Sequence, residues 1–199
     1  MERKQNMVHI VSVLVENHFG VLARISGLFS ARGFNIDSLA VGETEDPTVS
    51  RMTIAVHGDE RVLEQIMKQL DKLVDVIKVM DLSQEERIER ELILVKVSAS
   101  VASRADIMQI VTTFRAKIVD ISPSSLTVEV TGSKGKVDAM IELLRPCGIR
   151  EVVRTGTIAL SRKRELKALP SEKGQSEQNL VDAETAVFKK EKILQKRKK

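Results

Sequence analysis

The sequence is poor in aromatic residues and cysteine, and each shortage narrows what the chain can be. It has no Trp and no Tyr, and aromatic residues make up 3% of its 199 residues. A sheet that binds RNA needs aromatic rings on which bases stack, so that function is excluded by residue type. Cys147 is the one cysteine, which rules out an internal disulfide and a CxxC metal site. A lone thiol fits a reducing compartment, and we expect a cytoplasmic protein.

Long apolar runs and catalytic motifs are also missing. No apolar stretch approaches the ~20 residues that span a bilayer, so we expect no membrane association. The histidines, His9, His18 and His57, have no partner at metal-ligand spacing, and no metal site is expected. Walker A, GxSxG and GxGxxG motifs are absent, and no acid–base pair stands out among the carboxylates. These absences favour a protein without a catalytic site of its own.

The net charge of +4 is concentrated at the C-terminal end. Residues 162–199 hold twelve basic and six acidic residues, a net charge of +6, which leaves −2 for the rest of the chain. The basic isoelectric point therefore belongs to this tail and is weak evidence for nucleic-acid binding. We expect the tail to be partly disordered or helical, with one apolar helical face formed by Leu180, Ala183, Val187 and Leu194.

Apolar periodicity predicts an α+β chain with two ferredoxin-like βαββαβ units. Alternating apolar residues mark the strands, and apolar residues at helical spacing mark the helices between them. The predicted organisation is a first unit over residues 8–82, a charged linker over 83–90, a second unit over 91–161 and the tail over 162–199. Asp59 is expected to cap one helix, and Ser103 with Asp106 resembles a capping box before another.

The most informative stretch covers residues 15–39, where a predicted strand leads into a helix and then into a second strand. Gly20 falls at the start of that helix, and Gly33 falls just past its end. The first N–H groups of a helix lack internal partners, and the helix dipole places partial positive charge there. Because glycine leaves this backbone uncovered, an anion can approach it closely.

Asn17 follows the first predicted strand of this stretch, and Asn35 lies at the start of the second. We expect both to flank the same corner as Gly20. Each offers an amide carbonyl and an NH2 group, so the corner would suit a small zwitterion such as an amino acid. Glycine before a helix is often only a tight turn, and asparagine is common at strand ends for the same reason. Spacing alone does not decide between a ligand site and a turn.

The same stretch carries a family resemblance. The pattern E-N-x-x-G-V-L-x-R-I-x-G-L-F-x-x-R-G-F-N-I-x-S-L resembles the opening of the small, regulatory subunit of acetolactate synthase (acetohydroxyacid synthase). D-P-T-V-S-R-M-T-I at residues 46–54, Q-L-x-K-L-V-D-V-I-K-V at 69–79 and E-R-E-L-I-L-V-K-V at 89–97 are similar to the same family. The resemblance runs over residues 7–162, with its motifs in the same order.

The resemblance implies that the first unit is an ACT domain, an amino-acid-sensing module that pairs edge to edge into a homodimer. It also implies a large catalytic subunit as partner, which would hold thiamine diphosphate, Mg2+ and FAD, while this chain holds no cofactor. The small subunit would raise synthase activity and confer feedback inhibition by valine or another branched-chain amino acid. The binding residues carried over are Asn17, Gly20, Val21, Leu22, Asn35 and Ile36, with Asn35 expected to come from the partner subunit of the dimer.

Two other functions stay open on the residues alone. A free-standing amino-acid sensor could act on nucleic acid through the basic tail, but no helix-turn-helix pattern supports it. A small ferredoxin-like enzyme would need an acid–base pair, and none is found. The amino acid that is preferred and the stoichiometry with a large subunit are not readable from the sequence.

Overall fold

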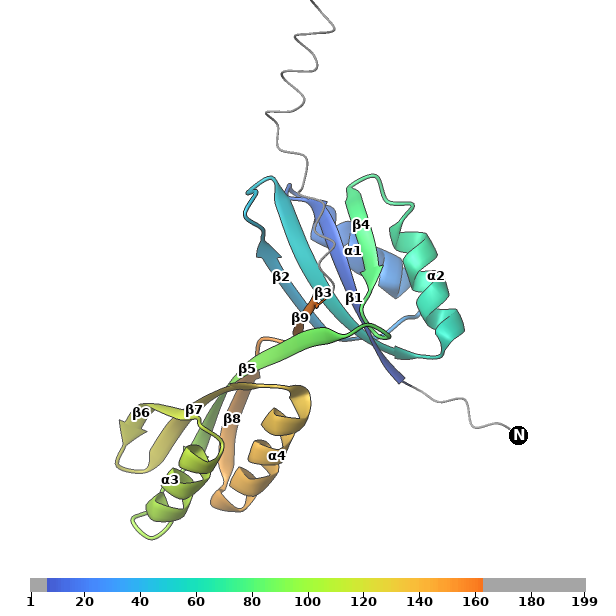
Figure 1. Cartoon of the computed structure of the whole chain (residues 1–199). Coiled ribbons are helices and arrows are strands. Elements are labelled where there is room, and N and C mark those ends of the chain that lie inside the picture. The colour runs from blue at the N-terminus through green and yellow to red at the C-terminus, as the bar shows by residue number, and fades with distance from the viewer. Residues whose placement is uncertain (1–6, 163–199) are drawn as a thin grey trace, which may run out of the picture. The chain divides into compact units, whose positions relative to one another are not determined.

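The computed structural model describes residues 7–162, and within them the two predicted βαββαβ units are present (Figure 1). In the first unit the strands form an antiparallel sheet in the order β2-β3-β1-β4. Both of its helices, α1 and α2, lie on one face of that sheet (Figure 1). Its elements are β1 (Met7–Glu16), α1 (Val21–Ala31), β2 (Ile36–Glu43), β3 (Val49–Gly58), α2 (Glu60–Leu70) and β4 (Val76–Asp81).

The second unit repeats this arrangement with the strand order β6-β7-β5-β8, and a further short strand, β9, pairs with β5. The ferredoxin-like, α+β prediction is therefore confirmed. Its elements are β5 (Arg87–Ser98), α3 (Arg104–Thr113), β6 (Lys117–Ser122), β7 (Ser125–Gly132), α4 (Lys134–Leu144), a 3₁₀ turn (Arg145–Cys147), β8 (Ile149–Arg154) and β9 (Ile158–Ser161).

Each unit has its own core between sheet and helices, built almost entirely from aliphatic side chains as the scarcity of aromatics requires. In the first unit Ile25 and Phe29 of α1 and Ile66 of α2 are at most 1% exposed. They pack on the valines and isoleucines that β1 and β3 direct to the same face. The ring of Phe34, just after α1, packs edge to face on the ring of Phe29, with the two ring centroids 6.4 Å apart.

A third, smaller cluster lies on the other face of the first sheet. It joins Ile10 and Ala55 from that sheet to Leu82, which follows β4, and to Ala159 of β9. Strand β9 is held by pairing with the first part of β5, where Arg87 lies opposite Ser161. Residues from the middle and from the end of the described chain thus pack against the first sheet.

The predicted linker over residues 83–90 is partly wrong, because β5 begins at Arg87 and continues without a break to Ser98. Its first residues are charged and lack the apolar alternation that marks a half-buried strand. They are strand because they pair with β9, and the side chains of Arg87 and Glu89 form an ion pair at 3.1 Å.

The two predicted helix caps have different outcomes. Asp59 caps α2 as expected, since its Oδ1 accepts the N–H of Val62 at 3.0 Å. The capping box at Ser103 is wrong: the Ser103 hydroxyl contacts Ser100 and makes no cap bond to α3. Its backbone is helical rather than extended, so the hydroxyl is not directed at the first turn. The apolar face predicted for the tail lies outside the described residues.

Candidate functional site

Helix α1 begins at Gly20 in the way an anion site requires. Gly20 has a φ of +91°, in the left-handed region, and the first helical bond runs from Arg24 N–H to the Gly20 carbonyl at 3.0 Å. No side chain caps α1, and no acidic residue stands in its first turn. The neighbouring helix α2, by contrast, is capped by Asp59. The first N–H groups of α1 therefore have no side-chain acceptor within the described part of the chain.

Asn17 fastens the end of β1 to the hairpin between β2 and β3. Its side-chain NH2 group donates to Glu43 Oε1 at 3.1 Å and to the Pro47 carbonyl at 2.8 Å. Its backbone N–H donates to the Thr48 carbonyl at 2.6 Å. Because the NH2 group is engaged, the side-chain carbonyl is the part of Asn17 that remains for a ligand, with no hydrogen-bond partner among residues 7–162.

Asn35 does not share this corner within one subunit, so that expectation is wrong for a single chain. Strands β1 and β2 both pair antiparallel with β3 and therefore run parallel to each other. Asn17 follows the end of β1, whereas Asn35 precedes the start of β2, at the other end of the sheet. Helix α1 separates them, and its 11 residues span about 16 Å. The Asn35 NH2 group donates to Asp37 Oδ1 at 3.2 Å.

The apolar residues of the proposed site differ in how much surface they offer. Val21 is 3% exposed and packs in the core of the first unit, so it holds α1 in place and offers almost no surface to a ligand. Leu22 is 45% exposed beside it, and Ile36 is half-buried at the start of β2. Phe19, which the sequence reasoning missed, is 99% exposed immediately before Gly20. The sequence signal that could have identified Phe19 is an aromatic residue in a polar loop directly before a glycine.

A compact ionic cluster supports the same helix start. Arg24 of α1 donates to Asp75 Oδ2 at 2.6 Å, and the Asp75 side chain is 8% exposed. His18 Nε2 lies 3.2 Å from Asp75 Oδ1 and 3.3 Å from Glu16 Oε2. The ligand atoms of Glu16, His18 and Asp75 lie within 4.8 Å of one another, which the spacing of His18 in the sequence does not reveal. Arg24 already provides the positive charge next to Asp75, which weighs against a metal there.

The side chain of Arg24 also bears on the glycine itself. A Cβ placed on Gly20 would lie 3.8 Å from Arg24 Nη2. The guanidinium thus lies beside the uncapped helix start, where it adds positive potential to that of the helix dipole. The helix dipole and Arg24 favour a bound carboxylate at the N–H groups, and Asp75, which pairs with Arg24, offsets part of that positive charge.

The fold and this corner together define a class: a protein with an ACT domain, in which a βαββαβ unit carries a glycine at the start of its first helix. Residues 11–78 match the model described as the AHAS small subunit-like ACT domain. Residues 90–163 match the model of the small subunit of acetolactate synthase. The chain belongs to the family of acetolactate synthase small subunits.

Individual relatives agree with this family. The chain is 57% identical over 155 residues to the probable acetolactate synthase small subunit of Methanothermobacter thermautotrophicus, covering 77% of this chain and 92% of the relative. It is 49% identical over 160 residues to the small subunit of Aquifex aeolicus, covering 80% and 83%. The crystal structure of the small subunit from Thermotoga maritima superposes with a TM-score of 0.73 at 43% identity, over 79% of this chain and 99% of that one.

Helices of the described residues do not combine the length and apolar content that crossing a membrane requires. The predicted absence of catalytic, cofactor and metal sites stays a prediction. So do the individual roles of Asn17, Gly20, Val21, Leu22, Asn35 and Ile36.

Proposed function

We propose that this chain is the regulatory subunit of an acetolactate synthase, which activates the catalytic large subunit and makes it sensitive to inhibition by valine. The observation that supports this most is the uncapped, glycine-started α1 in a chain of the acetolactate synthase small-subunit family. An amino-acid effector needs a carboxylate site, and a helix start with free N–H groups is one.

Valine would bind with its carboxylate at the α1 start. The N–H groups of residues 20–22 hold the carboxylate, and Arg24 adds positive charge nearby. The free carbonyl of Asn17 accepts from the ammonium group. Exposed Leu22 and Phe19 offer apolar surface to the isopropyl group, whereas buried Val21 holds the helix in place.

A homodimer completes the site. Strand β2 is at the edge of its sheet, and its outer backbone groups are free to pair with a second copy. A two-fold axis at this edge pairs the two β2 strands antiparallel. The start of β2 in one subunit then lies near the end of β2 in the other, where Glu43 holds Asn17. Asn35 and Ile36 of one subunit would thereby reach the Gly20 corner of the partner subunit.

The chemistry of the synthase would lie wholly on the large subunit. We propose that thiamine diphosphate, Mg2+ and FAD are bound there and that this chain supplies none of their ligands. The complex would work in the cytoplasm, where the reduced Cys147 is stable. The free-standing, nucleic-acid-binding sensor remains the alternative, and it would act through a tail that lies outside the described residues.

The test is reconstitution with the catalytic large subunit from the same organism. The two chains should co-purify, synthase activity should rise on adding this chain, and valine should lower that activity in a saturable way. Leucine, isoleucine and D-valine serve as comparison ligands in the same titration. Failure to bind the large subunit, together with nucleic-acid binding that weakens steeply with salt, would favour the alternative.

A further inference from the structure

A chain of polar contacts begins at Asn35 and follows the start of β2. The Asn35 side chain donates to Asp37, and Asp37 also contacts His57 Nδ1 of β3. Asp37 falls where the pairing of β2 with β3 shifts register, between Ile36 and Ser38. A shift in register is a place where a strand can be re-aimed without breaking the sheet on either side. A side-chain contact therefore links Asn35 to Asp37, the residue directly before Ser38.

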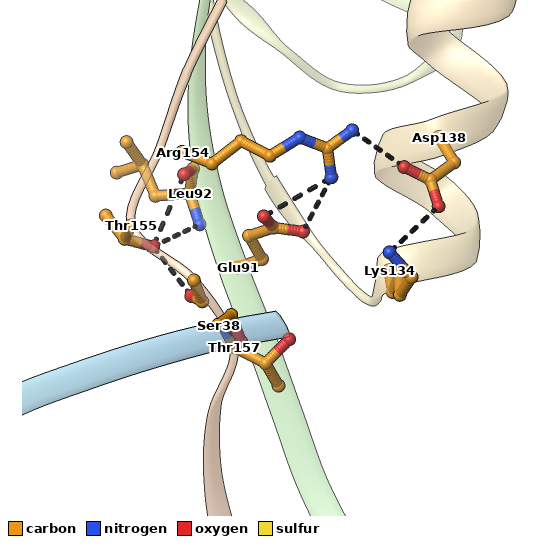
Figure 2. A network of polar contacts seen from close by, with 9 residues as sticks. Ser38, Glu91, Leu92, Lys134, Asp138, Arg154, Thr155 and Thr157 are labelled. Atoms are coloured by element: carbon orange, nitrogen blue, oxygen red, sulfur yellow. Dashed lines mark hydrogen bonds and ion pairs between the residues drawn. The ribbon is translucent and has the colours of Figure 1, made fainter. Parts of the chain in front are cut away.

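Ser38 is the residue of β2 on which the segment between β8 and β9 rests. The backbone N–H of Thr157 points to Ser38 Oγ at 3.4 Å, and Thr157 is 9% exposed (Figure 2). Gly156, one residue earlier, has a φ of +80°. A Cβ on Gly156 would lie 3.2 Å from Ser38 Cβ, a tight contact that Ser38 could accept only by shifting slightly, and 3.5 Å from the Leu39 backbone nitrogen, an ordinary contact. A side chain at residue 156 would therefore press on Ser38 and shift this contact.

The same segment continues into the second unit through a set of polar contacts (Figure 2). The Thr155 hydroxyl accepts the N–H of Leu92 at 3.2 Å, and Arg154 Nη1 lies 3.3 Å from both carboxylate oxygens of Glu91. Glu91 is 5% exposed, and this arginine is the positive group beside its buried carboxylate. Arg154 Nη2 donates to Asp138 of α4 at 2.8 Å. Polar contacts, joined by the backbone between residues 37 and 38 and between residues 154 and 157, thus link Asn35 to helix α4.

A cavity of about 380 Å³ lies along this path. Its wall includes Ser38 and Leu39 of β2, Gly156 and Thr157 of the crossing segment, and Glu91 and Arg154 of the second unit. Open space beside a close contact gives the crossing segment somewhere to move, which a fully packed contact would not. The close approach at Gly156 and the cavity together describe a contact that can adopt a second arrangement.

We propose that the contact between Ser38 and Gly156 is where occupancy of the valine site, at Asn35, is passed to the second βαββαβ unit and so to the large subunit. The inference rests on the proposed function and adds the route of its regulation. Valine that draws Asn35 toward the partner subunit's Gly20 shifts Asp37 and Ser38, and the segment at Gly156 follows. Arg154 then carries the change to Glu91 and Asp138 as a positioning residue.

The test compares Gly156→Ala with Gly148→Ala in the full-length chain. Both glycines have left-handed backbones, with φ of +80° and +82°, so both substitutions carry the same kind of strain. Only the methyl group at residue 156 presses on Ser38, because a Cβ at residue 148 meets Ser98 at ordinary distances of 3.5 and 3.6 Å. Gly148→Ala is therefore the matched control for strain.

Two readouts separate binding from transmission. Calorimetry on the free subunits should give valine affinities within about 3-fold of wild type for both variants. In the reconstituted synthase, saturating valine should inhibit the Gly148→Ala complex as it does wild type, while the Gly156→Ala complex keeps most of its activity.

Ser38→Ala is the second variant, and it needs no backbone strain. It removes the hydroxyl that faces Thr157 and should weaken maximal inhibition in the same direction, even where Gly156→Ala folds poorly. Equal inhibition of wild type, Ser38→Ala and Gly156→Ala at saturating valine overturns the inference. Absence of valine binding to the wild-type subunit would instead overturn the proposed function itself, so the two failures are distinguishable.

Discussion

At the scale of single residues, Gly20 meets two requirements at once. Its φ of +91° places it in the left-handed region that other residues avoid, and its missing side chain leaves the first N–H groups of α1 open. The sequence reasoning anticipated only the second. Aspartate is otherwise favoured at a helix start, but at residue 20 it would be strained by this backbone conformation.

Gly20→Asp should abolish sensitivity to valine, and Gly20→Ala is its matched control. Both variants should lose about 1–2 kcal/mol of stability to left-handed strain. Only the aspartate places a carboxylate on the helix N–H groups, and it lies within reach of Arg24. Losing a charge-assisted bond of roughly 1.5–3 kcal/mol weakens valine roughly 10- to 150-fold. An equal loss of valine affinity in both variants, measured by calorimetry, would show that strain and not charge is responsible.

Arg154 and Asp138 make the second unit sensitive to acid. A hydrogen bond from Arg154 holds the pKa of the Asp138 carboxyl below its ordinary value of 3.8. Burial lowers the pKa of Arg154, but Asp138 and Glu91 more than offset this effect, so its pKa is raised and it stays charged. Because the folded-state pKa of Asp138 is depressed, its contribution is present above pH 3.8 and is lost as pH falls through the lowered value.

Asp138→Asn should therefore reduce the loss of stability in acid. Urea unfolding at pH 7 should show wild type more stable than the variant by at most about 1 kcal/mol, since Asp138 is partly exposed. The difference should shrink as pH falls below 3.8. A constant difference between the two proteins from pH 7 to pH 3 would show that the Asp138 charge does not stabilise the fold.

At the scale of elements, the starts of the two helices of the first unit differ: α2 is capped by a side chain and α1 is not. Asp59 satisfies the start of α2, and that cap was predictable because aspartate precedes an apolar helical repeat. The start of α1 is left open, which a stability argument alone does not explain. The failed box at Ser103 shows the limit of such patterns: the hydroxyl had an alternative acceptor, Ser100, that the spacing does not reveal.

Asp59→Ala should destabilise the protein by about 1 kcal/mol, the usual cost of losing an N-cap side chain. Ser133→Ala at the start of α4 is the control, because Ser133 makes no side-chain cap bond. Its cost should be smaller. Urea midpoints of the two variants provide the comparison. If Ser133→Ala loses as much stability as Asp59→Ala, the Asp59 cap does not stabilise the protein.

The βαββαβ order of the elements could be predicted from the sequence. Which residues that order brings together, and which it separates, could not. The two βαββαβ repeats were readable from apolar periodicity, since each buries one face of a sheet. The separation of Asn17 from Asn35 was not, because it depends on β1 and β2 both pairing with β3. The first residues of β5 were missed because partners far along the chain, in β9, make them strand.

At the scale of the whole described chain, β5 and β9 make the first unit depend on later residues. Ala159 covers Ile10 and Ala55 on the face of the first sheet that α1 and α2 leave open. A fragment ending at residue 84 lacks this cover. A domain boundary at the end of β4 therefore fits the repeat in the sequence, but it cuts through the packing of the third cluster.

The fragment of residues 1–84 should still bind valine but unfold at lower urea concentration than a chain ending at residue 162. Uncovering Ile10 costs up to roughly 1.5–3 kcal/mol, the value for exposing a large aliphatic side chain. Midpoints of urea unfolding, with valine calorimetry on both chains, give the comparison. If the fragment and the longer chain unfold at the same midpoint, the third cluster contributes nothing.

The central claim is that valine binds between two subunits, with Gly20 from one and Asn35 from the partner subunit. The most direct measurement is calorimetry on a mixed dimer of Gly20→Asp and Asn35→Ala chains, purified through two different tags. Neither parent homodimer should bind valine measurably. One of the two sites in the mixed dimer combines both substitutions, while the other is fully wild type. The account predicts one site per dimer with wild-type affinity. A mixed dimer that binds no valine would contradict it, since a site within one chain is damaged in both subunits.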